Sequence, residues 1–167
     1  MAGKYKNSSQ LCPLKDKKKI KEVSMNKNNN EIKGIINEIK GMEDLTEKNL
    51  KPEDYAVPGG LAEKIAKGSK IKTAQLRKFF NEIKRLHQIT KSKKDIEEIK
   101  LPLIKLIPQL IFAKNRDVIS DEFYNLLEAC ILKKKENGKM ECRFKSYEEF
   151  ENFVSFLEAI VAYQKGG

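Results

Sequence analysis

The stretch Lys70–Ile89, KIKTAQLRKFFNEIKRLHQI, constrains the fold most, because its apolar residues recur with the period of an α-helix. They follow the i, i+3, i+4, i+7 spacing that gathers side chains into one stripe of a helix: Leu76, Phe79, Phe80, Ile83 and Leu86. Thr73 stands where the N-cap residue of such a helix belongs. The stretch therefore predicts an amphipathic helix that buries one side.

The other side of this predicted helix is cationic. Between Lys64 and Lys94 the chain carries eleven Lys or Arg residues and one acidic residue, Glu82. An exposed helical face normally mixes both signs, because i,i+4 ion pairs stabilise a helix and like charges destabilise it. A face that carries almost only positive charge indicates a polyanionic partner. The alternative is that the helix is simply basic and exposed to solvent.

Helical spacing of apolar residues continues on both sides of this stretch. It predicts short helices near residues 32–39 and 61–66, with a loop from Lys51 to Gly60 between them. Further along, Ser120 and Ser146 stand as N-cap residues before two more apolar-periodic segments. Strand patterning is scarce, so the predicted fold is all-α, a compact bundle of about five helices.

The most hydrophobic segment follows Asp95 and is expected to form a central helix that is buried on nearly all sides. It contains Pro102 and Pro108. An interior proline costs a helix about 3 kcal/mol, so we expect a break near Lys100 and a kink or restart near Ile107.

Composition separates the first thirty residues from the rest. Residues 1–30 hold eight lysines, two acidic residues and few large apolar side chains. Such a segment buries too little surface to offset its ordering entropy, so we expect a mobile basic arm, with residues 31–167 forming a single helical domain. The arm is interpreted either as an RNA-contacting tail or as variable N-terminal sequence.

The chain as a whole is basic, with a formal net charge of +10. This charge favours nucleic acid or an anionic membrane surface as a partner. No run approaches the roughly 18 apolar residues of a membrane span, and no secretory signal is visible. The cysteines are an odd set without C-x-x-C spacing, typical of reduced thiols: Cys12, Cys130 and Cys142. We expect a cytoplasmic protein that does not bind a membrane.

Motifs that carry chemistry are missing from the sequence. His87 is the one histidine, placed beside an apolar stripe, where a packed residue is more common than a catalyst. There is no H-x-x-x-H, no C-x-x-C and no phosphate-binding G-x-x-x-x-G-K-S/T loop. We therefore expect no catalytic residues, no metal site and no cofactor, and the chain is not predicted to be an enzyme.

Three motifs, in their order along the chain, resemble a known family. They are the cationic Gln75–Phe80, then Ile111–Arg116, and then the closing Phe153–Lys165. The pattern is similar to that of the small subunit of the type III-A CRISPR effector, the Csm complex: S/T-x-x-Q-L-R-K-F-F/Y, L-x-Y-A-x-x-R and F-x-x-F-F-x-A-I-V-A-Y-H-K. The resemblance covers about residues 60–165, and it departs from the pattern at Gln164, where histidine is frequent.

The resemblance implies a non-catalytic helical subunit present in several copies. Copies of the chain are expected to form a filament beside the backbone subunits of the Csm complex, and the large subunit is a further expected partner. This filament lines the channel where the target RNA pairs with the guide RNA (crRNA) in antiviral defence. A protein in that position needs only to hold phosphates, because base pairing reads the sequence.

The candidate RNA-binding residues are cations of two clusters. The first is the cationic helix with the residues just before it, and the second is the end of the apolar segment: Lys70, Lys72, Arg77, Lys78, Lys84, Arg85, Lys114 and Arg116. Only Arg77, Lys78 and Arg116 occupy positions of the family motifs. Lys133–Lys135 is left open between RNA contact and a helix C-terminus, where cations are favoured anyway.

Two other classes of function remain as alternatives. A stand-alone basic helical DNA-binding protein would read bases with residues such as Gln75 and Arg77, but no helix-turn-helix spacing precedes them. A small helical nuclease is disfavoured by the missing set of metal ligands.

Overall fold

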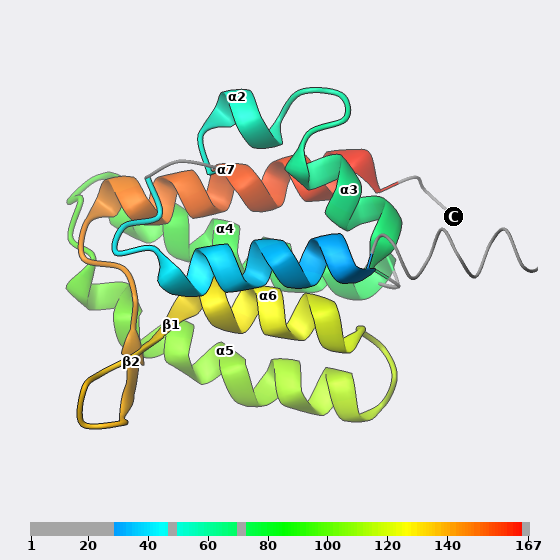
Figure 1. The fold of residues 1–167 in the computed structure, drawn as a ribbon. Coiled ribbons are helices and arrows are strands. Elements are labelled where there is room, and N and C mark those ends of the chain that lie inside the picture. Colours follow the sequence, from blue (N-terminus) through cyan, green and yellow to red (C-terminus); the bar gives the residue numbers. More distant parts are fainter. Residues whose placement is uncertain (1–28, 47–49, 70–72, 165–167) are drawn as a thin grey trace, which may run out of the picture.

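The computed structural model describes residues 29–46, 50–69 and 73–164. Within these ranges the chain forms seven helices and one two-stranded hairpin (Figure 1). The fold is mostly helical as predicted, although it is not purely α and it has more helices than the expected five. The predicted basic arm lies outside the described residues apart from residues 29 and 30, which already belong to the first described helix, residues 29–41.

The C-terminal helix α7, Tyr147–Tyr163, begins at the predicted cap. The Ser146 hydroxyl accepts a hydrogen bond from the Glu149 amide at 3.2 Å, and the Glu149 carboxylate accepts one from the Lys145 amide at 2.6 Å. Seven apolar residues of α7 are buried, and three of its aromatic rings pack edge-on or tilted against Phe144 and Tyr55. This helix therefore carries a large part of the core.

Helices α2, α3 and α4 pack against α7. Helix α3, Leu61–Gly68, confirms the short helix that the sequence predicted near residues 61–66. Helix α2, Pro52–Tyr55, corrects the predicted loop, because Pro52 sits at the first helical position, where its missing N–H would have no partner in any case. The ring of Tyr55 is buried 5.3 Å from that of Phe156, which holds this short helix in place.

The cationic stretch forms α4, Thr73–Lys91. Its predicted stripe is confirmed in Leu76, Ile83 and Leu86, which are fully buried, while Phe79 and Phe80 are half-buried at its edges. The side chain of Thr73, and with it the predicted N-cap, lies outside what the structure describes.

Helix α5, Glu97–Asn115, runs without a break through both prolines. The predicted break near Lys100 is wrong, and so is a restart of the helix near Ile107, because tertiary packing outweighs the local cost. Five apolar side chains of α5 are buried, and at about 1.5–3 kcal/mol each they offset the roughly 3 kcal/mol cost of an interior proline. The expectation that α5 is buried on nearly all sides is also wrong, since Leu101, Ile104, Ile111 and Phe112 are exposed.

Helix α6, Asp121–Ile131, begins at the predicted Ser120 cap, whose hydroxyl accepts from the Phe123 amide at 3.3 Å. It lies alongside α5, joined to it by a short loop (Figure 1). It ends in a hairpin that the sequence reading missed. Strand β1, Leu132–Lys134, pairs antiparallel with β2, Met140–Cys142, so Lys133 and Lys134 lie on a strand and not on a helix end.

Two backbone hydrogen bonds close the turn of this hairpin. The Gly138 amide donates to the Lys135 carbonyl at 2.9 Å, and the Lys135 amide donates to the Lys139 carbonyl at 2.8 Å. Gly138 has a φ of +80°, the left-handed conformation required in a three-residue hairpin loop. Asn137-Gly138 is thus a hairpin turn.

A buried arginine joins three parts of the core. Arg143, directly after β2, is almost fully buried. Its guanidinium donates to the Ala129 carbonyl of α6 at 3.0 Å and to the Met42 carbonyl just after helix 29–41. Its backbone amide also donates to the Ile131 carbonyl at 2.8 Å. Arg143 therefore attaches the N-terminal helix, α6 and the hairpin to one another.

Truncating this side chain tests that role. Arg143→Ala leaves two buried carbonyls without donors, and each unsatisfied group costs about 1–3 kcal/mol. We expect the free energy of unfolding in a urea titration to fall by about 2–4 kcal/mol. The control Lys134→Ala, at an exposed hairpin position, is expected to change it by less than about 0.5 kcal/mol. Equal effects of the two variants would contradict the role of Arg143.

Candidate functional site

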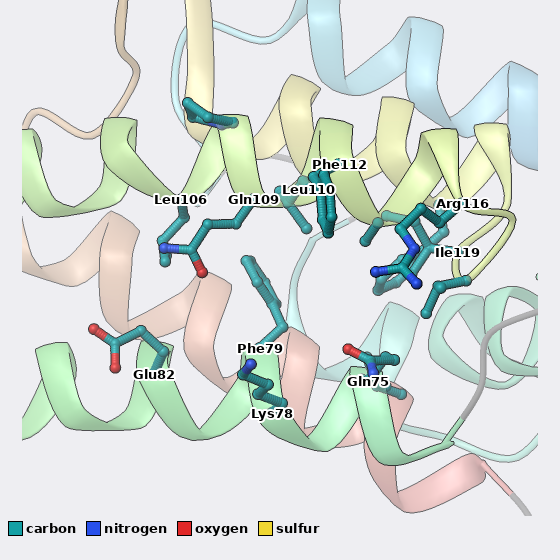
Figure 2. A pocket seen from close by; sticks show the side chains of 15 residues that line it. Gln75, Lys78, Phe79, Glu82, Leu106, Gln109, Leu110, Phe112, Arg116 and Ile119 are labelled. Atoms are coloured by element: carbon teal, nitrogen blue, oxygen red, sulfur yellow. The ribbon is translucent and has the colours of Figure 1, made fainter.

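A groove runs between α4 and α5, open to solvent and about 850 Å³ in volume (Figure 2). Side chains of α4 form one wall, α5 forms the other, and Val118 and Ile119 of the α5–α6 loop close one end. The groove combines apolar, amide and charged side chains: Gln75, Lys78, Phe79, Glu82, Leu106, Gln109, Leu110, Phe112 and Arg116 among them.

The amphipathic pattern of the two helices produces this groove. Leu76 of α4 and Leu106 and Leu110 of α5 are buried and form its floor. Phe79 is half-buried and projects from α4 toward α5, while Phe112 is 62% exposed on the opposite wall (Figure 2). The two helices therefore do not close over the apolar surface between them.

Two cations of the groove are free of carboxylate partners in the part of the chain that the structure describes. Lys78 on α4 is exposed and makes no ion pair there. Arg116, just after α5, makes none either, and its guanidinium carbon lies 5.3 Å from the centroid of the Phe112 ring. A guanidinium over an aromatic ring is attracted by the electrons of the ring face. The structure thus brings two predicted RNA-binding residues together from helices that are distant in sequence.

The single acid of the groove is already paired. Arg85 Nη2 lies 2.6 Å from Glu82 Oε1, and the Arg85 Nε also donates to the same carboxylate. This hydrogen bond and charge lower the pKa of Glu82 and raise that of Arg85. The pair carries no net charge at neutral pH, so the net charge of the groove comes from Lys78 and Arg116.

The remaining predicted site residues lie elsewhere. Lys84 pairs with Glu158 of α7 at 3.1 Å, and Arg77, seven residues earlier, lies on the same side of α4. Lys114 pairs with Asp121 at 3.3 Å and lies over the ring of Tyr124. The predicted single cationic face is therefore divided into an α7 side and an α5 side. Lys70 and Lys72 lie outside the described residues.

Two groove residues on α5, Phe112 and Gln109, are not among the predicted site residues, although Phe112 lies within a family motif. Their common signal is a place on α5 next to buried leucines, which the hydrophobicity of the whole segment conceals.

A second basic surface surrounds the hairpin. Lys133 and Lys145 both contact Glu43, at 2.6 and 3.5 Å, and Lys135 pairs with Glu141 at 2.7 Å. These carboxylates neutralise much of the local positive charge. The groove between α4 and α5 is therefore the better candidate site for an anion.

His87 packs as a core-edge residue, as the sequence indicated. Its Nε2 lies 3.0 Å from the Tyr147 hydroxyl, and the two rings stack with centroids 5.8 Å apart. Burial lowers the pKa of His87 below the ordinary 6.5; Lys84 and Lys91 lower it further, while Glu151 opposes the shift.

This shift predicts a pH dependence of stability. Below about pH 6.5 the unfolded chain takes up the His87 proton more readily than the folded one. The free energy of unfolding should therefore fall from pH 7.5 to pH 5.5 by more in the parent than in His87→Gln, as followed by urea titration at each pH. Identical pH profiles would show that His87 is not desolvated in the folded chain.

In residues 29–46, 50–69 and 73–164, no group of three or more His, Cys, Asp or Glu is placed to hold a metal ion. Over the same ranges, no helix is long and apolar enough to cross a membrane.

The chain matches a family of known proteins. A family model described as Csm2 Type III-A matches residues 53–166. This range holds α3 to α7, the hairpin and every residue of the α4–α5 groove. No curated protein and no solved structure matches the chain significantly.

Proposed function

The chain belongs to the Csm2 type III-A family, the non-catalytic small subunit of the type III-A CRISPR effector complex, and we propose that it holds RNA by its phosphates at the α4–α5 groove. The alternatives of a stand-alone DNA-binding protein and of a small nuclease are set aside, because the family model covers most of the described chain.

One observation carries the proposal. Lys78 and Arg116 occupy positions of the family motifs, come from different helices, and line one groove without a carboxylate partner among the described residues. Free cations on a rigid surface bind phosphates without reading bases. That property suits a complex in which the guide RNA reads the target by base pairing.

The finer role follows from the resemblance and from the charge. We propose that residues 31–167 act as one helical domain, in the cytoplasm, in several copies stacked beside the backbone subunits. The groove of each copy then faces the channel that holds the guide and target RNA. Arg77, on the α7 side of α4, is exposed and free of an ion pair in the described chain, so it extends the same basic surface.

Charge reversal tests the groove directly. Each phosphate neutralised contributes a slope of about −0.7 to log K against log salt for a single strand. The double variant Lys78→Glu/Arg116→Glu should make the slope for single-stranded RNA less steep by about 1.4. It should weaken binding of unrelated sequences by similar factors, which titrations at several salt concentrations would measure.

The matched control is Lys40→Glu, a charge reversal on the exposed face of helix 29–41 and away from the groove. We expect a much smaller effect from it. Equal losses in both variants would mean that overall charge, and not the groove, binds the RNA. A loss limited to certain sequences would favour a protein that reads bases.

Neutralising the acid of the groove should act in the opposite direction. Glu82→Gln releases Arg85 and removes one negative charge beside Lys78. If this allows one more phosphate to be neutralised, affinity at 0.15 M salt should rise about fourfold. Glu158→Gln, which releases Lys84 on the α7 side, should change it by less. A larger gain from Glu158→Gln would move the binding surface to the α7 side of α4.

In the assembled complex the groove variants should separate two functions. The backbone subunits would still hold the guide RNA, so Lys78→Glu/Arg116→Glu should impair target capture more than guide loading. Guide content and target affinity of purified complexes measure the two. A complex that binds target as tightly as the parent would contradict the proposal.

A further inference from the structure

Phe112 is the most exposed of the large apolar side chains in the described chain, at 62%. Leaving an aromatic ring in water forgoes the stabilisation that burial of a large apolar side chain provides. Exposed apolar residues that gather in a concave surface commonly mark a binding site. Phe112 lies in such a surface, because it lines the α4–α5 groove (Figure 2).

Phe112 and Phe79 project into the groove from opposite walls (Figure 2). Among the described aromatic residues, these two make no ring contact with each other. The space between the walls is therefore not filled by a ring pair. Flat aromatic guests fit such a site, because rings stack favourably in offset or edge-on arrangements.

Amide side chains stand beside the aromatic rings. Gln75 on α4 and Gln109 on α5 both line the groove and are exposed. Neither makes a side-chain hydrogen bond within the described residues. Each amide offers both a donor and an acceptor, which the edge of a nucleobase also requires.

The positive charges of the groove favour a nucleic acid as its ligand. Lys78 and Arg116 flank the aromatic rings, and Arg85 already neutralises Glu82. Cations that follow a backbone, combined with aromatic side chains on which bases stack, are the combination that holds single-stranded nucleic acid. An apolar protein helix would leave the amides and both cations without partners. The rest of the exposed apolar face of α5, Leu101, Ile104 and Ile111, lies outside the groove.

We propose that the α4–α5 groove binds one unpaired RNA nucleotide, with its base stacked on Phe112, the base edge beside Gln75 and Gln109, and its flanking phosphates on Lys78 and Arg116. This site rests on the proposed RNA-binding function and adds a base-stacking contact to it. Since every base has an aromatic face, the contact is tolerant of sequence.

Truncation of the ring tests the site, with two probes. The first is a single-stranded RNA with 2-aminopurine in place of one adenine, and the second is the same strand with an abasic residue at that position. Base stacking is worth about 1–3 kcal/mol per base, so Phe112→Ala should weaken binding of the first strand at least about fivefold. It should also remove the change in 2-aminopurine fluorescence that accompanies binding to the parent protein, while binding of the abasic strand stays unchanged.

Ile111→Ala is the matched control, an exposed apolar truncation outside the groove, and it should affect neither strand. Phe112→Trp should keep both the affinity and the fluorescence change on binding. Because Phe112 is exposed, these variants are expected to fold, and circular dichroism of each checks this.

The possible outcomes distinguish failure of the base-stacking site from failure of the proposed RNA-binding function. If Lys78→Glu/Arg116→Glu weakens RNA binding but Phe112→Ala does not, the base-stacking site is wrong and the phosphate contacts stand. The same conclusion follows if Phe112→Ala weakens binding of both strands equally. If none of these variants affects RNA binding, the proposed function fails as well. If Phe112→Ala acts only on assembly with other subunits, the groove is a protein interface and the proposal is overturned.

Discussion

The burial of α7 is the constraint on which the rest of the structure depends. Its apolar side chains require cover on several sides, and α2, α3 and α4 supply much of it. In doing so α4 uses its apolar stripe, Leu76, Ile83 and Leu86, and only its polar arc and the edges of the stripe remain exposed. The cationic surface of the molecule is thus a direct consequence of which side of α4 the core needs.

The second consequence concerns α5, which packs against α6 and β2 as well as α4. With its buried residues shared among these neighbours, α5 does not close over α4, and Phe79 and Phe112 remain on the walls of an open groove. Helix α4 places Lys78 there, and the end of α5 places Arg116 there. A groove of this kind joins an apolar floor to free positive charge, which suits a ligand that is both aromatic and anionic.

Much of the fold could be predicted from the sequence, because helical periodicity and the caps Ser120 and Ser146 are local signals. The hairpin could not be predicted in the same way, since strands of three residues are too short to show alternation, although Asn137-Gly138 is a local turn signal. The continuity of α5 through its two prolines depends on tertiary packing, which local sequence rules do not predict. In the candidate site, the sequence alone was enough to predict the group of cations. Their division into free and paired ones depends on partners as distant as Glu158, and the groove depends on how two helices lie in space.

RNA is expected to lie at the α4–α5 groove when this subunit is part of its complex. Photo-crosslinking of a 4-thiouridine-substituted target RNA in the assembled effector, with the crosslinked peptides identified by mass spectrometry, tests it most directly. We expect crosslinks in α4 and in the second half of α5, at residues that line the groove. Crosslinks confined to the hairpin, or none to this subunit while the backbone subunits crosslink, would contradict the account.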